Sequence, residues 1–228
     1  MESKILSNTL PVTLGTDPTS NESVNIDLAQ CGNMLIGGAT KQGKSHCIHN
    51  LTSQLNTLPV PPKMILFDPK RCEFGRYKDR FRVIEDLEDA KRVLFEELFE
   101  NEIICKRWSS DKDRSPLVII IDELLDLIFM HKSKSSKYVS DRIRYEAIIK
   151  ILDIGPELNI FTIISTQSSD KDILTKKILD NCQTRLAFRT INAQDSRRIL
   201  KKPGAEDLLG RVEAILYQEG KCRKIQCP

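Results

Sequence analysis

The sequence predicts an α/β protein with a mostly parallel central sheet and helices on both faces. Short apolar runs alternate with stretches of helical spacing along most of the 228 residues. One of these runs, Leu117–Ile121, is continuously apolar and β-branched, as strands buried on both faces of a parallel sheet are. The segments between successive runs are long enough to cross over from one parallel strand to the next.

Length and composition favour one globular domain. A chain of 228 residues suits a single α/β domain with a full core and is short for two. We expect one domain over 1–228, in which 1–30 is an N-terminal β-hairpin extension and 31–228 is the core. With 40% hydrophobic residues, 29% charged residues and a formal charge of +3, the chain lacks the uniform basicity of histone-like proteins. Any contact with nucleic acid must therefore come from local patches.

The chain shows no signal for a membrane or for secretion. Its apolar runs are far below the ~18 residues of a membrane span, and its first ten residues lack the pattern of a secretory signal. The seven cysteines are scattered, and neither they nor the three histidines have the spacing of a metal site. We expect a cytoplasmic protein with free thiols.

The first elements predicted along the chain are a hairpin, a strand, a helix and a second strand. Leu10–Leu14 and Val24–Leu28 alternate apolar with polar residues around a segment rich in turn formers, which predicts a β-hairpin. Asn33–Gly37 predicts a short buried strand, and Ser45–Leu58 predicts an amphipathic helix that a proline cluster ends. Lys63–Lys70 is an apolar strand that ends in a carboxylate and a proline turn.

The rest of the chain continues this alternation, and Ser140 is a candidate helix cap. The elements expected there are an outer helix over Leu87–Trp108, a strand over Leu117–Ile121, a short apolar helix, a basic loop over His131–Tyr138, a helix over Ser140–Gly155, a strand over Ile160–Gln167, a helix over Asp170–Cys182, a strand over Arg185–Thr190, short helices over Asp195–Leu200 and Glu206–Leu209, and a terminal hairpin over Val212–Ile225.

The segment Gly38–Ser45 has the spacing of a phosphate-binding loop, G-x-x-x-x-G-K-[ST]. In such a loop backbone N–H groups surround the phosphates, the lysine reaches the outer phosphates and the hydroxyl contacts Mg²⁺. The loop follows a predicted strand and begins a predicted helix, whose N-terminus favours anions. We therefore expect ATP and Mg²⁺, rather than an ordinary glycine turn. The expected nucleotide contacts are Gly38, Ala39, Thr40, Lys41, Gln42, Gly43, Lys44, Ser45 and His46.

Two acids directly follow the most apolar strand. Asp122 is placed to hold the Mg²⁺ that Ser45 also contacts, and Glu123 is placed to take a proton from an attacking water. The alternative is that both acids only cap the next helix. With a phosphate loop upstream, the pair favours a hydrolase over a nucleotide store.

Further catalytic candidates lie near the ends of two later strands. Gln167 ends its strand, where a polar side chain can orient water or sense the γ-phosphate. Oligomeric enzymes of this kind often use an arginine from a neighbouring subunit to neutralise charge in the transition state. Arg185 and Arg189 flank a predicted strand and are the candidates, with ordinary surface arginines as the alternative.

Taken in order, these segments resemble the motor domain of the FtsK/SpoIIIE family of DNA translocases, in the HerA-FtsK branch of the P-loop ATPases. The resemblance covers residues 10 to about 217, and its C-terminal segments are more specific than the phosphate loop. It rests on Leu10–Gly15, Phe67–Lys70, Ile121–Leu127, Ile164–Gln167, Thr184–Arg189, Asp195–Leu200 and Gly204–Gly210.

The resemblance implies a RecA-like ATPase that assembles as a hexameric ring and pulls double-stranded DNA through its channel. Local basic patches of this chain are of the kind that bind phosphates without reading bases. For each patch a solvated face is the alternative. The candidate DNA contacts are Lys132, Lys134, Lys137, Arg142, Arg144, Lys171, Lys176 and Lys177.

The chain also departs from the large chromosome-segregating members of the family. We expect no membrane span, no separate ring-forming domain and no winged-helix module, which leaves room for a membrane-anchored partner. Ile154–Asn159 replaces the family's basic, glycine-containing segment, so no arginine role is assigned there. We expect a DNA motor of a plasmid, of another mobile element, or of a minimal chromosomal type. Two alternatives stay open: a protein-moving ATPase of type VII secretion, and a regulator that binds nucleotide only to assemble.

Overall fold

Ten strands and several helices make up the part of the chain that the computed structural model describes, residues 9–94, 115–128 and 136–228, with the backbone alone for 136–141. The strands are β1 (Pro11–Thr16), β2 (Ser23–Asp27), β3 (Met34–Gly37), β4 (Lys63–Phe67), β5 (Arg82–Ile84), β6 (Leu117–Ile121), β7 (Ile160–Thr166), β8 (Thr184–Phe188), β9 (Glu213–Gln218) and β10 (Lys221–Gln226). The helices are α1 (Leu28–Cys31), α2 (Lys44–Asn56), α3 (Leu87–Arg92), α5 (Leu124–Ile128), α6 (Ser136–Ile154), α7 (Lys176–Asn181) and α8 (Ala193–Leu200), with 3-10 turns at Gly75–Tyr77, Pro156–Leu158 and Ala205–Asp207.

All ten strands join one sheet in the order β2-β1-β10-β9-β8-β3-β7-β6-β4-β5. The six strands from β8 to β5 are parallel to one another. Strands β9, β10, β1 and β2 extend this sheet through antiparallel pairs. The predicted α/β class with a mostly parallel core and two β-hairpins is confirmed, and the two hairpins pair with each other at Thr16 and Gln226.

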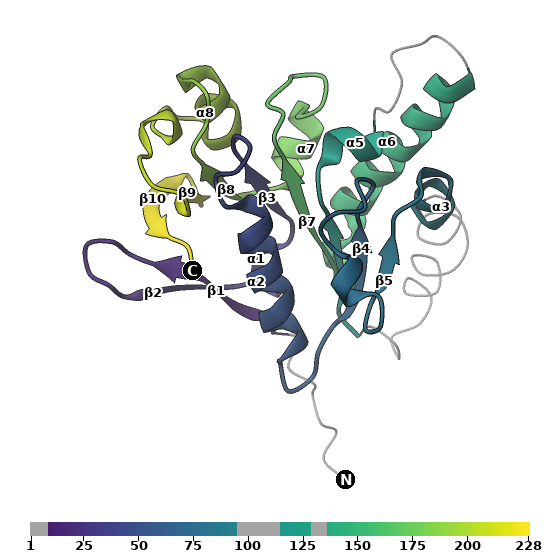
Figure 1. Ribbon diagram of the computed structural model, residues 1–228, viewed down its shortest axis with the longest axis horizontal. Coiled ribbons are helices and arrows are strands. Elements are labelled where there is room, and N and C mark those ends of the chain that lie inside the picture. The colour runs from purple at the N-terminus through teal and green to yellow at the C-terminus, as the bar shows by residue number, and fades with distance from the viewer. Residues whose placement is uncertain (1–8, 95–114, 129–135) are drawn as a thin grey trace.

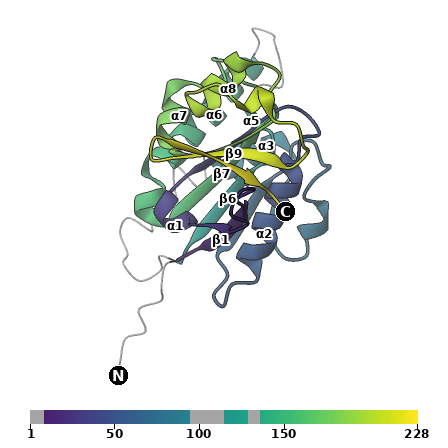
Figure 2. The same cartoon turned by 90° about the vertical axis from the view of Figure 1, so that its left-hand side faces the viewer.

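Helices cover both faces of the sheet, with α2 on one side and α6 and α7 on the other (Figures 1 and 2). Strand β6 shows why its sequence is continuously apolar. Leu117, Ile119 and Ile121 face the apolar cluster that includes α6, whereas Val118 and Ile120 face the cluster that includes α2. Burying one such side chain contributes roughly 1.5–3 kcal/mol, so both faces of this strand stabilise the sheet.

Several boundaries differ from the sequence prediction. Strand β5 was not predicted, because three residues are too few for a periodic pattern. Helix α6 begins at Ser136, so Ser140 lies inside the helix and is not its cap. Helix α7 begins at Lys176 instead of Asp170, since the backbone at 170–174 forms a turn in which the Asp170 carbonyl accepts from the N–H groups of Ile173 and Leu174.

Two predicted segments fall largely outside the described residues. Of the helix expected over 87–108, the structure describes α3 and the residues to 94. Of the basic loop expected over 131–138, residues 131–135 lie outside the described residues. Within the described part of the chain, every helix is too short or too polar to serve as a membrane span.

Candidate functional site

The parallel strands bring their carboxyl ends to one edge of the sheet, where predicted site residues follow β3, β7 and β6 and a further carboxylate follows β4. Strand β3 leads into the phosphate loop, and its neighbour β7 leads into Gln167. Beyond β7, β6 leads into Asp122 and Glu123, and β4 leads into Asp68. Ligands of open parallel sheets bind at this edge. Residues from distant parts of the sequence therefore converge on the loop.

The backbone of the phosphate loop needs its glycines. Gly38 and Gly43 have φ of 143° and 115°, which favour glycine. A Cβ on Gly38 would lie 2.8 Å from Cβ of Phe188, and one on Gly43 would lie 3.1 Å from both Phe188 and Val212. Strand β8 and the residue before the terminal hairpin thus press against the loop. Any side chain at either glycine would push the loop away from them.

Two backbone hydrogen bonds fix the loop to these neighbours. The Ala39 N–H donates to the Arg189 carbonyl over 2.8 Å, and the Val212 N–H donates to the Gln42 carbonyl over 3.1 Å. Val212 is β-branched and yet has φ of 66°, an unfavourable conformation that these contacts hold in place. The C-terminal segments are remote from the loop in sequence but belong to its structural support.

Lys44 is buried beneath the loop that it follows. Its Nζ donates to the carbonyls of Gly38 and Ala39 over 2.7 and 2.8 Å. Burial lowers the pKa of Lys44 to about 8, and the charges of Glu123 and Asp122 oppose that shift. The ammonium group therefore lies at the centre of the loop and close to the two acids after β6. Lys41 and His46, two of the other expected contacts, are solvent-exposed at its rim.

Ser45 has a partner that the sequence did not reveal. Its Oγ donates to Glu73 Oε1 over 3.1 Å. The other Glu73 oxygen lies 3.2 Å from Nε2 of His49, whose Nδ1 lies 3.2 Å from the Tyr77 hydroxyl. Glu73 follows β4 by a few residues, and no motif spacing relates it to the loop. Only the packing of the segment after β4 against α2 in the folded protein brings it to Ser45.

A turn built on Asp68 carries Glu73 to the site. The buried carboxylate of Asp68 accepts from the backbone N–H groups of Cys72, Glu73 and Phe74, over 3.3, 2.9 and 2.8 Å. These three bonds fold residues 68–74 back toward α2. Lys70, in the same turn, forms an ion pair of 2.8 Å with Asp126 on α5. The carboxylate and the lysine of the Asp-Pro-Lys segment therefore have structural roles that hold the turn against the site.

Asp122 lies where several carboxylates converge. Burial raises its pKa to about 7, and the negative charges of Glu73, Asp68 and Glu123 add to the shift. The described residues contain no group of three or more His, Cys, Asp or Glu side chains that could hold a metal by itself. A hydroxyl and a carboxylate are, however, the oxygen ligands that Mg²⁺ uses together with substrate phosphates and water. Ser45 and Asp122 fit that donor set.

Glu123 and Gln167 are bonded to each other and, through Gln167, to the phosphate loop. Glu123 has φ of 60° and its carboxylate accepts from Thr166 Oγ1 over 2.9 Å and from the Gln167 N–H over 2.9 Å. The Gln167 side-chain oxygen accepts from Thr40 Oγ1 over 2.6 Å. The acid after β6, the polar residue after β7 and the loop after β3 therefore form one hydrogen-bonded unit.

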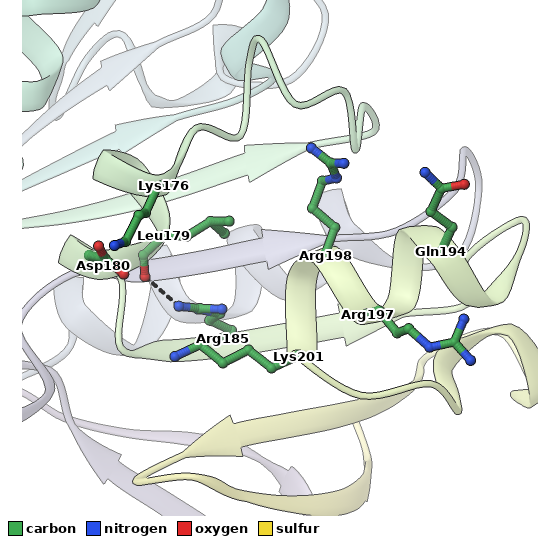
Figure 3. Close-up of a pocket in the computed structure, with 8 residues that line it drawn as sticks. All are labelled: Lys176, Leu179, Asp180, Arg185, Gln194, Arg197, Arg198 and Lys201. Carbon is green, nitrogen blue, oxygen red and sulfur yellow. Dashed lines mark hydrogen bonds between the residues drawn. The ribbon is translucent and has the colours of Figure 1, made fainter.

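The two arginine candidates lie in different environments. Arg185 is 1% exposed, and its guanidinium donates to the backbone carbonyls of Cys182, Ile199 and, as Figure 3 shows, Leu179. It cannot reach another subunit, so the expectation that Arg185 acts as an arginine finger is wrong, and its role is to bind β8 to α7 and α8. Arg189 is exposed beside the phosphate loop, where its carbonyl binds Ala39.

The candidate DNA contacts also differ in their exposure to solvent. Arg144 is buried and its Nε donates to the Leu127 carbonyl over 2.8 Å, which contradicts its assignment as a DNA contact. Lys132 and Lys134 lie outside the described residues, as does the side chain of Lys137. The remaining candidates are solvent-exposed, namely Arg142, Lys171, Lys176 and Lys177.

The fold and the loop together define the class of P-loop ATPases, and solved structures of this class have the same fold. The pCW3 conjugation coupling protein TcpA, solved in its monomer form with ATPγS, aligns with a TM-score of 0.80 and 20% identity, over 95% of this chain and 65% of TcpA. The cytoplasmic domain of the type VII secretion ATPase EccC from Thermomonospora curvata aligns with a TM-score of 0.73 and 20% identity, over 96% of this chain and 28% of that one.

Sequence comparison narrows the class to a family. The model of the FtsK/SpoIIIE family matches residues 3–96. The chain is 32% identical over 251 aligned residues to the DNA translocase FtsK of Chlorobaculum tepidum, an alignment that covers 96% of this chain. The predicted resemblance is confirmed, and the chain is a relative of the FtsK/SpoIIIE family. It spans 30% of the length of the Chlorobaculum protein.

Proposed function

We propose that this chain is an ATP-hydrolysing motor domain that moves double-stranded DNA, in DNA transfer or segregation on a chromosome, a plasmid or another mobile element. The hydrogen-bonded unit of Thr40, Gln167 and Glu123 is the observation that supports coupled hydrolysis. Identity of about 30% to DNA translocases over more than nine-tenths of the chain supports DNA as the substrate.

In the proposed mechanism the loop amides and Lys44 bind the phosphates of ATP, while Ser45 and Asp122 hold Mg²⁺. When the metal ion is bound, it would neutralise part of the negative charge of the phosphates. Glu73 accepts the hydroxyl hydrogen of Ser45, which leaves the lone pairs of that oxygen available to the metal. This contact makes Glu73 a positioning residue of the site.

Glu123 takes the proton of the attacking water, and Gln167 responds to the loss of the γ-phosphate. Because the Gln167 N–H binds Glu123 and its side chain binds Thr40, a change at the phosphates alters both contacts together. Gln167 therefore links hydrolysis to the segment after β7. That segment leads into α7, and it carries the signal away from the nucleotide.

We further propose that the chain works as a hexameric ring in the cytoplasm, with Arg189 as the arginine that neutralises charge in the transition state. Its exposed position next to the phosphate loop supports the choice. The ring, the location and any membrane-anchored partner follow from the family resemblance and are part of the same proposal.

The test is ATP hydrolysis with and without duplex DNA, at several salt concentrations, together with sizing in the presence and absence of ATP. We expect DNA to raise the rate several-fold, and we expect the effect to weaken steeply with salt, since phosphate contacts release counterions. Hydrolysis that ignores DNA would contradict the proposal and favour a protein-moving ATPase. Tight ATP binding with negligible hydrolysis would favour an assembly regulator.

A further inference from the structure

His49 lies one helical turn after Ser45 on α2, and the two side chains contact the same carboxylate. Residues four apart in a helix share one face, so both reach the segment after β4. Ser45 Oγ lies 3.1 Å from Oε1 of Glu73, and His49 Nε2 lies 3.2 Å from Oε2. Helix α2 therefore holds both oxygens of this carboxylate, and the proposed mechanism gives a role only to the contact with Ser45.

The hydrogen-bond partners of His49 select one tautomer of its ring. A carboxylate only accepts, so Nε2 carries the hydrogen that Glu73 receives. In a neutral ring Nδ1 then has a lone pair, which accepts from the Tyr77 hydroxyl over 3.2 Å. Burial, followed by the positive charge of Arg76, lowers the pKa of His49 by more than Glu73 raises it, so the neutral ring is the main form at neutral pH. The hydrogen bonds thus run in one direction, from Tyr77 through His49 to Glu73.

Aromatic packing holds the ring of His49 in this orientation. The ring meets buried Phe74 edge-on, with centroids 5.9 Å apart and planes at 88°, and its centroid lies 5.7 Å from that of Tyr77. The Tyr77 ring in turn contacts Phe81, with centroids 5.9 Å apart. Only 16% of the His49 side chain is exposed. The segment after β4 therefore supplies both the carboxylate and the rings that orient its histidine partner.

The turn that carries Glu73 fixes its backbone but not its side chain. Asp68 accepts from the Glu73 N–H, which sets the course of the chain there. The Glu73 side chain is 27% exposed, and glutamate loses much rotamer freedom when it is held in one orientation. The hydrogen bonds to Ser45 and His49 provide that orientation. Without the histidine donor, water can take its place at Oε2 and the carboxylate can turn away from Ser45.

We propose that His49 is a positioning residue of the metal site, which holds Glu73 in the orientation that accepts the hydrogen of Ser45 and leaves the Ser45 lone pairs to Mg²⁺. The inference rests on the proposed function and extends it to a residue outside the phosphate loop. Partners that orient a metal ligand typically change affinity or activity 10–100-fold. Because His49 acts through one further hydrogen bond, its loss should have a smaller effect, about 3–10-fold.

The experiment measures Mn²⁺ affinity in the presence of ATPγS by electron paramagnetic resonance. His49→Phe keeps an aromatic ring against Phe74 and Tyr77 but lacks the donor, so it should weaken Mn²⁺ binding by about 3–10-fold. His49→Gln keeps an N–H group near the position of Nε2 and should recover most of the affinity. Ser53→Ala is the control, because Ser53 is exposed one turn further along α2, and it should bind Mn²⁺ as the wild type does. Melting curves verify that every variant folds.

A double-mutant cycle distinguishes positioning from a purely structural role. If His49 acts through Glu73, His49→Phe should cause no further loss of affinity in a protein that already carries Glu73→Ala. Nitrogen NMR of the metal-free wild type, which needs no variant, should show the hydrogen of the neutral His49 ring on Nε2.

Four results would each overturn the role of His49: wild-type affinity in His49→Phe, equal losses in His49→Phe and His49→Gln, a full further loss in the Glu73→Ala background, or the ring hydrogen on Nδ1. Hydrolysis by the wild type that DNA stimulates would leave the proposed function standing in each case. A wild type that neither binds Mn²⁺ with ATPγS nor hydrolyses ATP would overturn the proposed function, and the role of His49 with it.

Discussion

At the scale of single residues, we assign proton transfer and nucleotide binding to different side chains of the site. Glu123 accepts two hydrogen bonds from the end of β7, which fix its carboxylate, and in the proposed mechanism it takes the proton of the attacking water. Lys44 is the residue that we propose binds the phosphates. The two positions should therefore fail in different ways when they are changed.

Glu123→Gln should abolish turnover while nucleotide binding persists, because an amide keeps the shape of the side chain but cannot take a proton. A general base contributes roughly 10²–10⁴-fold to the rate. Lys44→Ala should lose both binding and turnover. Single-turnover hydrolysis and fluorescent ATP binding measure the two effects, with the exposed Glu157→Gln as control. An unchanged rate in Glu123→Gln would show that another group is the base.

Asp122 should make the metal-free protein sensitive to pH. Burial and neighbouring carboxylates raise its pKa from 3.8 to about 7, so the folded state binds its proton more tightly than the unfolded state does. The free energy of unfolding should therefore fall as pH rises from about 4 to about 7. Asp122→Asn removes this dependence and should be more stable than the wild type above pH ~7, by on the order of 2–4 kcal/mol.

Melting curves without Mg²⁺ at pH values on both sides of this range measure that difference. The advantage of the Asn variant should shrink toward the acid end, where the wild-type carboxyl is also neutral. The same variant should lose hydrolysis at every pH, because it lacks a charged ligand for the metal. A stability difference that does not change with pH would contradict the raised pKa.

At the scale of elements, the turn after β4 connects a structural motif to the metal site. Asp68 fixes the turn through three backbone N–H groups, and the turn directs Glu73 at Ser45. Groups of this kind, which orient a metal ligand, typically change metal affinity or activity 10–100-fold when they are removed. Glu73→Ala should therefore weaken Mn²⁺ binding with ATPγS by roughly tenfold.

Electron paramagnetic resonance titration of Mn²⁺ measures this affinity without any turnover. Asp79→Asn is the control, because Asp79 is exposed and lies a few residues further along the same connection. It should bind Mn²⁺ as the wild type does. Equal affinities in Glu73→Ala and the control would show that Ser45 needs no such partner.

Strand β8 and the residue directly after it carry two arginines in different environments, and substitutions distinguish their roles. Arg185→Leu leaves three carbonyls without their donor and should lower the free energy of unfolding by about 3–5 kcal/mol. Arg189→Ala should leave stability unchanged, because the residue is exposed, and should lower hydrolysis in the assembled protein. Chemical denaturation and steady-state rates measure the two effects. A stable Arg185→Leu variant would contradict the structural role.

At the scale of the whole molecule, the sequence predicted those features that depend on residues close together in the chain. The strand before the phosphate loop and the strand before Asp122 and Glu123 were predicted from their apolar runs, and the loop and the two acids follow these strands directly. Glu73 and the burial of Arg185 and Arg144 depend on which elements become neighbours, so no spacing in the sequence could reveal them. The sheet order places β8 beside β3, and this pairing explains why the C-terminal segments support a loop that is far from them in sequence.

The central claim is that ATP hydrolysis at this site moves duplex DNA. Displacement of a third strand from a triplex tests movement directly, because a motor that tracks along a duplex strips the third strand from its path. We predict displacement by the wild type in ATP, none in ATPγS and none by Glu123→Gln in ATP. Hydrolysis that DNA stimulates while the triplex stays intact would contradict the claim that this protein is a motor.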